Sequence, residues 1–283
     1  MKIKGLLIFL GMLGACNSAV VEQQGGQRRL ITAGGTITEI VYELGFGDQI
    51  IATDITSTYP KTMQELPSIG YRNQIKAEGI LALGPDLLLA ETGYLSDEVL
   101  TQLTATGLEI HLFDKPKNVS ETYQLIHSLA KYLDVPDIGN QLSEMLKADM
   151  DKLEAFTAGF SVRPSMAFVM ARGQETVFLA GEDTFADELI RLAGAQSTGK
   201  GFKDFIPLTP ESLVSMDPEY LLFFDSGIAS LGGKEGLKKI RGLESTSAFQ
   251  KDRILAYDGL YLSGFGPRVG KAAYEIAKTI SGS

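Results

Sequence analysis

Apolar and polar positions follow two alternating spacings along most of the chain. Short continuous apolar runs, which are typical of buried strands, are separated by stretches in which apolar side chains recur every three or four residues, as in helices. In the first part of the chain the runs predict strands at 29–33, 49–53, 87–91 and 109–113. The helical spacing predicts helices at 36–44, 78–83 and 97–106. Strands that alternate with helices indicate a parallel sheet covered on both faces.

The pattern changes at residue 118. The sequence Asn118-Val119-Ser120-Glu121 is typical of a helix capping box and predicts a helix to about Leu133. Pro136 can begin a second helix, in which one stripe is apolar except at Asp149. The apolar positions of this stripe are Ile138, Leu142, Met145, Leu146, Leu153 and Phe156. We interpret 119–158 as a helical connector between an N-terminal lobe at 28–118 and a C-terminal lobe at 159–283.

The alternating pattern returns after Pro164 and repeats part of the first lobe. Glu78–Leu89 and Glu211–Leu222 share the order glutamate, apolar positions, proline, acidic residue and apolar run. The remaining pattern predicts a helix through Leu237, Ile240 and Leu243, a strand at 253–257 and a final helix through Ala277. The sequence therefore predicts an α/β protein of two Rossmann-like lobes with parallel sheets, joined by a long connecting helix. Such lobes leave a cleft between them, where ligands bind at the carboxyl ends of the strands.

The first residues resemble the signal of a bacterial lipoprotein. Lys2 and Lys4 precede a short apolar core, and the segment ends in Leu13-Gly14-Ala15-Cys16, which is similar to a lipobox. We expect a signal peptide at 1–15, lipidation of Cys16 and a polar tether over the rest of 16–27. Several acyl chains on one residue would anchor the protein stably. The expected location is the periplasmic face of a membrane, or the cell surface in a host without an outer membrane.

Composition narrows the possible functions. The 283 residues are 44% hydrophobic and 22% charged, which is typical of a globular protein. The net charge is −9, and removal of Lys2 and Lys4 with the signal peptide changes it to −11. This acidity argues against a nucleic acid partner, because phosphate binding needs a basic face. Cys16 is the single cysteine, so the chain can form no internal disulfide. We expect a monomer.

Tyr71 is the candidate ligand-binding residue of the first lobe. It follows a proline-containing loop and is next to Arg72. A nearby guanidinium favours ionisation of a phenol, and a phenolate oxygen can be an axial ligand of haem iron. The alternative is that Tyr71 is one of ten tyrosines and lies at the top of a turn. Tyr59, Tyr94, Tyr257 and Tyr261 are further aromatic residues that could line a cleft, and ordinary packing explains them equally well.

Other chemistry finds little support in the sequence. His111 and His127 are far from any cluster with metal-ligand spacing, and we interpret both as structural. No serine lies on a recognisable nucleophile elbow. The Gly-rich segment at 232–236 lacks the spacing of a phosphate-binding loop. We expect a protein that is not an enzyme, although a lipid-anchored α/β enzyme with its active site in the cleft remains an alternative.

Several segments together resemble the haemin-binding substrate-binding proteins of bacterial ABC importers, within the broader class that carries siderophores and cobalamin. The matching segments are 33–40, 54–60, 66–71, 76–81, 180–181, 186–187 and 264–268. The resemblance implies a two-lobed fold with small lobe movements and no catalytic cofactor. It further implies that haem b is the transported ligand, held by an axial tyrosinate from Tyr71. The same class includes carriers of a ferric siderophore or a cobalamin-like ligand, in which Tyr71 would be a contact only.

The chain departs from the family pattern at three positions. The family usually has an arginine two residues after the ligand tyrosine, whereas here Asn73 has that position and Arg72 precedes it. Ser226 replaces an arginine that is common before the following glycine. Arg172 is found where carriers of two haems have a histidine, so a second axial ligand is not evident. By this resemblance, the possible contacts of the haem or its propionates are Arg72, Asn73, Arg172 and Tyr59. The alternative for Arg172 is that it lies on a turn and faces solvent.

The resemblance also suggests how the protein meets its transporter. Proteins of this class present one acidic residue on each lobe to arginines of the ABC permease, and the matching residues are Glu78 and Glu211. Charges at a rim steer encounter and fix orientation more than they add affinity. The alternative is that the helix dipole favours a glutamate at each helix start. This explains each glutamate by itself but explains less well why both lobes have one at the same place.

Overall fold

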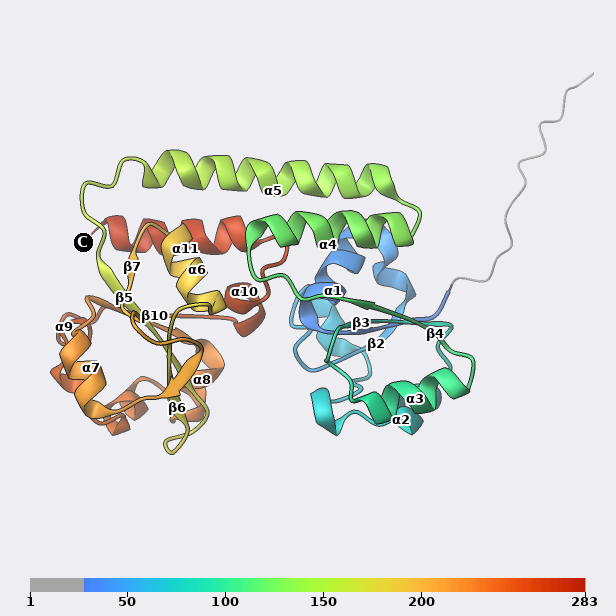
Figure 1. Ribbon diagram of the computed structural model, residues 1–283, viewed down its shortest axis with the longest axis horizontal. Coiled ribbons are helices and arrows are strands. Elements are labelled where there is room, and N and C mark those ends of the chain that lie inside the picture. The colour runs from blue at the N-terminus through green and yellow to red at the C-terminus, as the bar shows by residue number, and fades with distance from the viewer. Residues whose placement is uncertain (1–27, 283) are drawn as a thin grey trace, which may run out of the picture.

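The structure is a computed structural model that describes residues 28–282. It contains two sheets, each flanked by helices, and three longer helices that lie along one side of both (Figure 1). The predicted signal peptide, the lipidated Cys16 and the tether lie outside the described residues. Within residues 28–282, none of the helices combines the length and the apolar character that crossing a bilayer requires.

The first sheet is parallel throughout, as predicted. Its strands are β1 (Leu30–Ala33), β2 (Ile50–Thr53), β3 (Leu87–Glu91) and β4 (Glu109–Phe113), in the order β2-β1-β3-β4. Leu87 and Leu89 of β3 enter one hydrophobic core, and Leu88 and Ala90 enter a second core on the opposite face. A strand buried on both faces needs an unbroken apolar run, which is why the sequence identifies it. The associated helices are α1 (Gly35–Val41), α2 (Ala77–Leu81) and α3 (Asp97–Ala105).

The second sheet is mixed rather than parallel. Its strands are β5 (Ser165–Ala171), β6 (Val177–Ala180), β7 (Gln196–Ser197), β8 (Phe205–Pro207), β9 (Tyr220–Phe224) and β10 (Ile254–Tyr257). The order is β10-β9-β5-β6-β8, and β7 pairs with β5. Strands β10, β9, β5 and β7 are parallel, whereas β6 is antiparallel to both neighbours. Five residues connect β5 to β6, which is too short for a parallel crossover, so the chain turns back as a hairpin.

The internal repeat has a structural counterpart. The order β1-β3-β4 in the first sheet corresponds to β5-β9-β10 in the second. Each repeated segment forms a short helix followed by the middle strand of its set. In the first lobe these elements are α2 and β3, and in the second they are α7 (Pro210–Met216) and β9. The other short helices of this half are α6 (Phe185–Leu192), α8 (Asp225–Ser230), α9 (Ser247–Gln250) and α10 (Gly259–Ser263).

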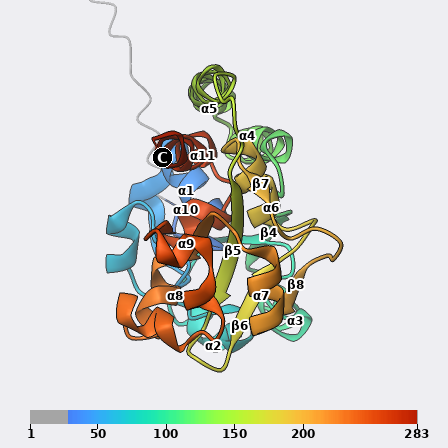
Figure 2. The same ribbon diagram turned by 90° about the vertical axis from the view of Figure 1, so that its left-hand side faces the viewer.

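Three longer helices form the layer that joins the lobes. They are α4 (Val119–Tyr132), α5 (Pro136–Thr157) and α11 (Val269–Ser281). Figure 1 shows α5 running above α4 on one side and α11 on the other, and Figure 2 shows the same layer end-on. The Asn118 side chain accepts a hydrogen bond from the backbone N–H of Glu121 at 2.9 Å, so α4 starts where predicted. The buried stripe of α5 is narrower than predicted, because Met145 is 57% exposed and Ile138 is also exposed.

One predicted helix is wrong. Leu237, Ile240 and Leu243 are buried, but Leu237 and Leu243 belong to two separate 3₁₀ segments, Lys234–Lys239 and Leu243–Ser245, and Ile240 lies between them in an extended conformation. Gly233 and Gly242, which precede these segments, have φ values of 87° and 88°. A left-handed backbone angle interrupts a right-handed helix, so the apolar spacing forms separate turns here.

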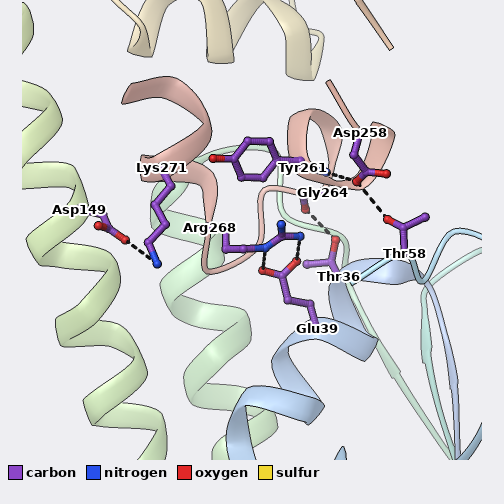
Figure 3. Close-up of polar contacts among 9 residues, drawn as sticks. All are labelled: Thr36, Glu39, Thr58, Asp149, Asp258, Tyr261, Gly264, Arg268 and Lys271. Atoms are coloured by element: carbon purple, nitrogen blue, oxygen red, sulfur yellow. Dashed lines mark hydrogen bonds and ion pairs between the residues drawn. The ribbon is translucent and has the colours of Figure 1, made fainter. Parts of the chain in front are cut away.

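Polar contacts tie residues 258–271 of the second lobe to the first lobe and to α5 (Figure 3). Both guanidinium nitrogens Nε and Nη2 of Arg268 donate to the carboxylate of Glu39 on α1, at 2.8 and 2.9 Å. The Thr36 hydroxyl donates to the Gly264 carbonyl at 2.8 Å, and the Thr58 hydroxyl donates to Asp258 at 3.0 Å. The two lobes are therefore joined through side chains as well as through the helical connector.

Candidate ligand-binding site

A cavity of about 680 Å³ lies between the two lobes. Its lining comes from the carboxyl ends of strands in both sheets: the first lobe contributes residues that follow or end β1 to β4, and the second lobe contributes the ends of β5, β9 and β10. Parallel α/β sheets bind ligands in the crevice outside the carboxyl ends of their strands. The cavity has the location that the sequence predicted for the cleft.

Tyr71 and Arg72 both line this cavity, together with Tyr94. The rings of Tyr71 and Tyr94 meet edge to face, with their centroids 6.4 Å apart. The Arg72 guanidinium lies 5.7 Å from the Tyr71 ring centroid and 5.1 Å from that of Tyr94. Arg72 has a φ of 40°, a strained backbone conformation that non-glycine residues rarely adopt outside functional sites and tight turns. The arginine therefore contributes a positive charge over both rings.

The two tyrosines differ in what their hydroxyl groups do. The Tyr94 hydroxyl donates a hydrogen bond to the buried carboxylate of Asp54. Burial and the Asp54 charge raise the pKa of Tyr94 well above its ordinary value, so this phenol stays protonated. The hydroxyl of Tyr71 forms no hydrogen bond with any of residues 28–282. Tyr71 therefore offers the cavity a phenol oxygen that has no other role in the described part of the chain.

This difference gives a stability prediction. We expect Tyr94→Phe to lower the free energy of unfolding by about 1.5–3 kcal/mol, because the buried carboxylate of Asp54 loses a charge-assisted hydrogen bond. The matched change Tyr71→Phe removes a hydroxyl without a partner, so its effect should stay within about 0.5 kcal/mol. Urea unfolding of both variants measures the difference. Equal losses in the two would contradict the distinct roles of the hydroxyls.

Glu91 is a buried carboxyl group at the end of β3 that also lines the cavity, with 4% of its surface exposed. Burial raises the pKa of Glu91 above 4.5, while the positive charges of Lys115 and Arg72 oppose the shift and Asp54 adds to it. In the pH range between 4.5 and the higher folded pKa, the folded state holds the proton and the unfolded state releases it. Stability contributed by Glu91 therefore falls as pH rises through that range.

We expect Glu91→Gln to remove this loss. Glutamine keeps an acceptor for the Thr36 backbone N–H that bonds Glu91, and it cannot ionise. The variant should gain stability relative to the wild type between pH 4 and pH 7, as measured by urea unfolding at both values. Glu65→Gln, on an exposed residue, is the control and should show no such gain. A pH-independent difference for Glu91→Gln would contradict the assignment.

The second lobe gives the cavity an aromatic wall. Phe185, Phe205 and Phe224 line it, and the rings of Phe185 and Phe224 are nearly parallel with centroids 5.8 Å apart. Phe185 and Phe205 lie 5.9 Å apart, and Met170 completes the apolar surface. Arg172 and Ser226 lie at the edge of this wall, where β5 and β9 end. The cavity thus combines an apolar wall with a phenol-bearing polar wall, which suits a large flat amphipathic ligand.

Cationic side chains in the lining lack carboxylate partners. Arg72, Lys115 and Arg172 form no ion pair with any described residue. A positive charge in a partly desolvated site favours an anionic ligand. Arg72 and Arg172 were identified from the sequence, but Lys115 was not. Lys115 belongs to no sequence motif. Only the tertiary structure, which places it after β4 beside the cavity, identifies it as a candidate site residue.

Other residues named from the sequence lie outside the lining. Asn73 is exposed in the short 3₁₀ turn after Tyr71. The ring of Tyr59 lies 3.6 Å from the guanidinium carbon of Arg268, so it packs on the inter-lobe contact. Tyr257 and Tyr261 contact each other with centroids 6.4 Å apart. Among the aromatic residues suggested for the cleft, Tyr94 lines the cavity.

Glu78 and Glu211 are exposed and occupy the first turns of α2 and α7. Both helices lie on the side of the molecule away from α5 in the two views (Figures 1 and 2). His111 packs against the rings of Phe113 and Tyr132, and His127 lies 3.4 Å from the Ser143 hydroxyl. Residues 28–282 contain no group of histidine, cysteine and acidic side chains able to hold a metal ion by themselves.

Comparisons with known proteins agree with this architecture. A family model described as "Periplasmic binding protein" matches residues 30–260. The chain is 23% identical over 256 residues to the uncharacterized ABC transporter substrate-binding lipoprotein YvrC of Bacillus subtilis (strain 168), covering 89% of this chain and 80% of YvrC. It is 29% identical over 169 residues to a vitamin B12-binding protein of Yersinia pestis (strain Pestoides F), covering 60% of this chain and 59% of that protein.

Two solved structures are similar over nearly their whole length. The periplasmic heme-binding protein RhuT from Roseiflexus sp. RS-1, in apo form, has a TM-score of 0.86 and 34% identity, covering 90% of this chain and 98% of RhuT. The periplasmic heme-binding protein BhuT, in complex with two hemes, has a TM-score of 0.83 and 32% identity, covering 91% and 99%. These relatives are binding proteins, in agreement with the expectation that the chain is not an enzyme. The chain belongs to the periplasmic binding protein family, as a substrate-binding protein of an ABC importer.

Proposed function

We propose that this protein captures ferric haem in the inter-lobe cavity, with the Tyr71 phenolate as the axial ligand of the iron. The observation that carries the proposal is that Tyr71 lines the cavity and that its hydroxyl bonds to no described residue. A phenolate is a known haem ligand. The Arg72 guanidinium lies 5.7 Å from the centroid of the Tyr71 ring, which places a positive charge beside the proposed ligand.

The rest of the cavity suits the remainder of the haem molecule. The phenylalanine wall provides an apolar surface for one face of a porphyrin, and aromatic rings prefer offset or edge contacts of this kind. The guanidinium groups of Arg72 and Arg172, which form no ion pair within residues 28–282, suit the propionates, because guanidinium binds carboxylates well. The heme-binding descriptions of RhuT and BhuT support the same ligand.

The proposal extends to delivery and location. We propose that Cys16 carries the lipid anchor, and the lipoprotein YvrC supports this. Glu78 and Glu211 would then face the permease, with one acidic residue on each lobe and both on the side away from α5. The protein would hold haem as a monomer and release it there.

A cobalamin-like ligand is the second candidate, because a vitamin B12-binding protein matches 60% of the chain. Titration of the purified protein with ferric haem, and separately with cyanocobalamin, distinguishes the two. We expect saturable haem binding with the visible charge-transfer absorption of a tyrosinate-ligated ferric haem, and no comparable cobalamin binding. Saturable cobalamin binding without haem binding would overturn the proposal in favour of the second candidate.

A further inference from the structure

Lys115 occupies the junction between the inter-lobe cavity and a neighbouring hollow. It lies two residues after the end of β4 and is half-buried. Lys115 lines the cavity of about 680 Å³ and also a second hollow of about 640 Å³ at the start of α4. A group attached to the edge of a ligand in the cavity could therefore extend past this ammonium group into the hollow.

The charges around Lys115 leave its ammonium available. Lys115 forms no ion pair with any described residue. The nearby Glu91 is buried at the end of β3 and bonds the Thr36 backbone N–H. Glu121, which lines the second hollow, accepts hydrogen bonds from the Lys117 backbone N–H and the Asn118 side chain. Glu91 and Glu121 thus have other partners or a buried position, whereas Asp114, which also lines the second hollow, is exposed to solvent.

The second hollow can accept a polar substituent. Thr92, Gln124 and Ser128 contribute hydroxyl and amide groups, while Phe113 and Leu125 form an apolar floor. The charged residues in its lining are Lys115, Lys117, Asp114 and Glu121, so a carboxylate would be favoured at the lysine side of the hollow. An ammonium on a flexible stem suits this role, because it can follow a carboxylate as a point charge rather than requiring one fixed geometry.

We propose that Lys115 binds a carboxylate at the edge of the ligand and thereby selects a carboxylate-bearing macrocycle over one whose edge carries neutral amides. The inference rests on the proposed haem function and goes beyond it, since it assigns the ligand's carboxylate to the first lobe, on the side of β4. It also separates the two candidate ligands: the two propionates of haem satisfy the requirement, and the amide-substituted edge of cobalamin does not.

The test combines a variant of the protein with a variant of the ligand. The wild type, Lys115→Gln and Lys131→Gln are each titrated with ferric haem and with ferric haem dimethyl ester, whose carboxylates are blocked. A charge-assisted hydrogen bond of this kind contributes roughly 10- to 100-fold in affinity. We expect Lys115→Gln to weaken haem binding by that factor, to leave ester binding unchanged, and to keep the wild-type visible spectrum at saturation. Lys131→Gln makes the same change in net charge on an exposed side chain of α4 that lines neither the cavity nor the second hollow, and it should bind haem as the wild type does.

The outcomes separate this inference from the proposed function. Equal haem affinity of Lys115→Gln and the wild type overturns the role of Lys115 while leaving tyrosinate binding in place. Equal weakening by Lys115→Gln and Lys131→Gln also overturns it, because a general loss of positive charge would then explain both. An equal loss for haem and ester shows a structural effect, which thermal unfolding of the variant detects. A wild-type protein without a tyrosinate spectrum rejects the proposed function itself.

Discussion

Tyr71→Phe is expected to abolish the tyrosinate absorption of the ferric haem complex. The change removes one oxygen and keeps the ring that contacts Tyr94 edge to face, so the cavity wall stays in place. Loss of a residue that merely supports a metal ligand costs about 10- to 100-fold in affinity, and loss of the ligand itself should exceed this. Visible spectra and haem titrations of the wild type and the variant measure both effects.

Tyr94→Phe is the control for this prediction, because Tyr94 lines the same cavity but its hydroxyl donates a hydrogen bond to Asp54. Its haem complex should keep the tyrosinate spectrum even though the protein is less stable. If Tyr71→Phe and the wild type give the same spectrum, Tyr71 is not the axial ligand. If Tyr94→Phe alone loses the spectrum, the roles of the two hydroxyls are reversed.

The sequence predicted those parts of the fold that depend on long apolar runs or local signals. Strand β3 was found because its residues are buried on both faces, and α4 was found because Asn118 caps it. The hairpin at β6 was not predicted, and the second sheet was expected to be parallel. The four residues of β6 are too few for their apolar pattern to show whether the strand runs parallel or antiparallel to β5. That direction follows from the length of the connection, which is five residues.

The candidate site was predicted in part. Tyr71 and Arg72 were found together because they are neighbours in the chain and form a local motif. The aromatic wall and Lys115 were not predicted, because the wall takes its members from α6, β8 and β9 and Lys115 follows β4, and only the tertiary fold brings these segments together. Tyr59 was suggested for the cleft, yet it packs on Arg268, which is distant in sequence. A single sequence identifies the tyrosines but not which ring faces which neighbour.

A second large effect, on stability, is expected from the ion pair that Glu39 and Arg268 form between the lobes. Glu39 has 2% of its surface exposed, and the Arg268 guanidinium that bonds it also lies over the rings of Tyr59 and Tyr261. Removal of one partner leaves a buried charge without compensation, which costs about 3–5 kcal/mol. We therefore expect Glu39→Leu and Arg268→Leu each to lower the free energy of unfolding by about that amount, as measured by urea denaturation.

The double variant decides whether the loss comes from the stranded charge or from the pair itself. When both charges are replaced by apolar groups, no buried charge remains, so Glu39→Leu/Arg268→Leu should lose clearly less than the sum of the single variants. Lys271→Gln is the matched control: its ammonium lies 3.8 Å from Asp149 and is half exposed, so the change should cost no more than about 1 kcal/mol. Additive losses in the double variant would mean that the two residues act independently. Coupled losses would instead identify Glu39 and Arg268 as one contact, which holds α1 of the first lobe against the start of α11 in the second.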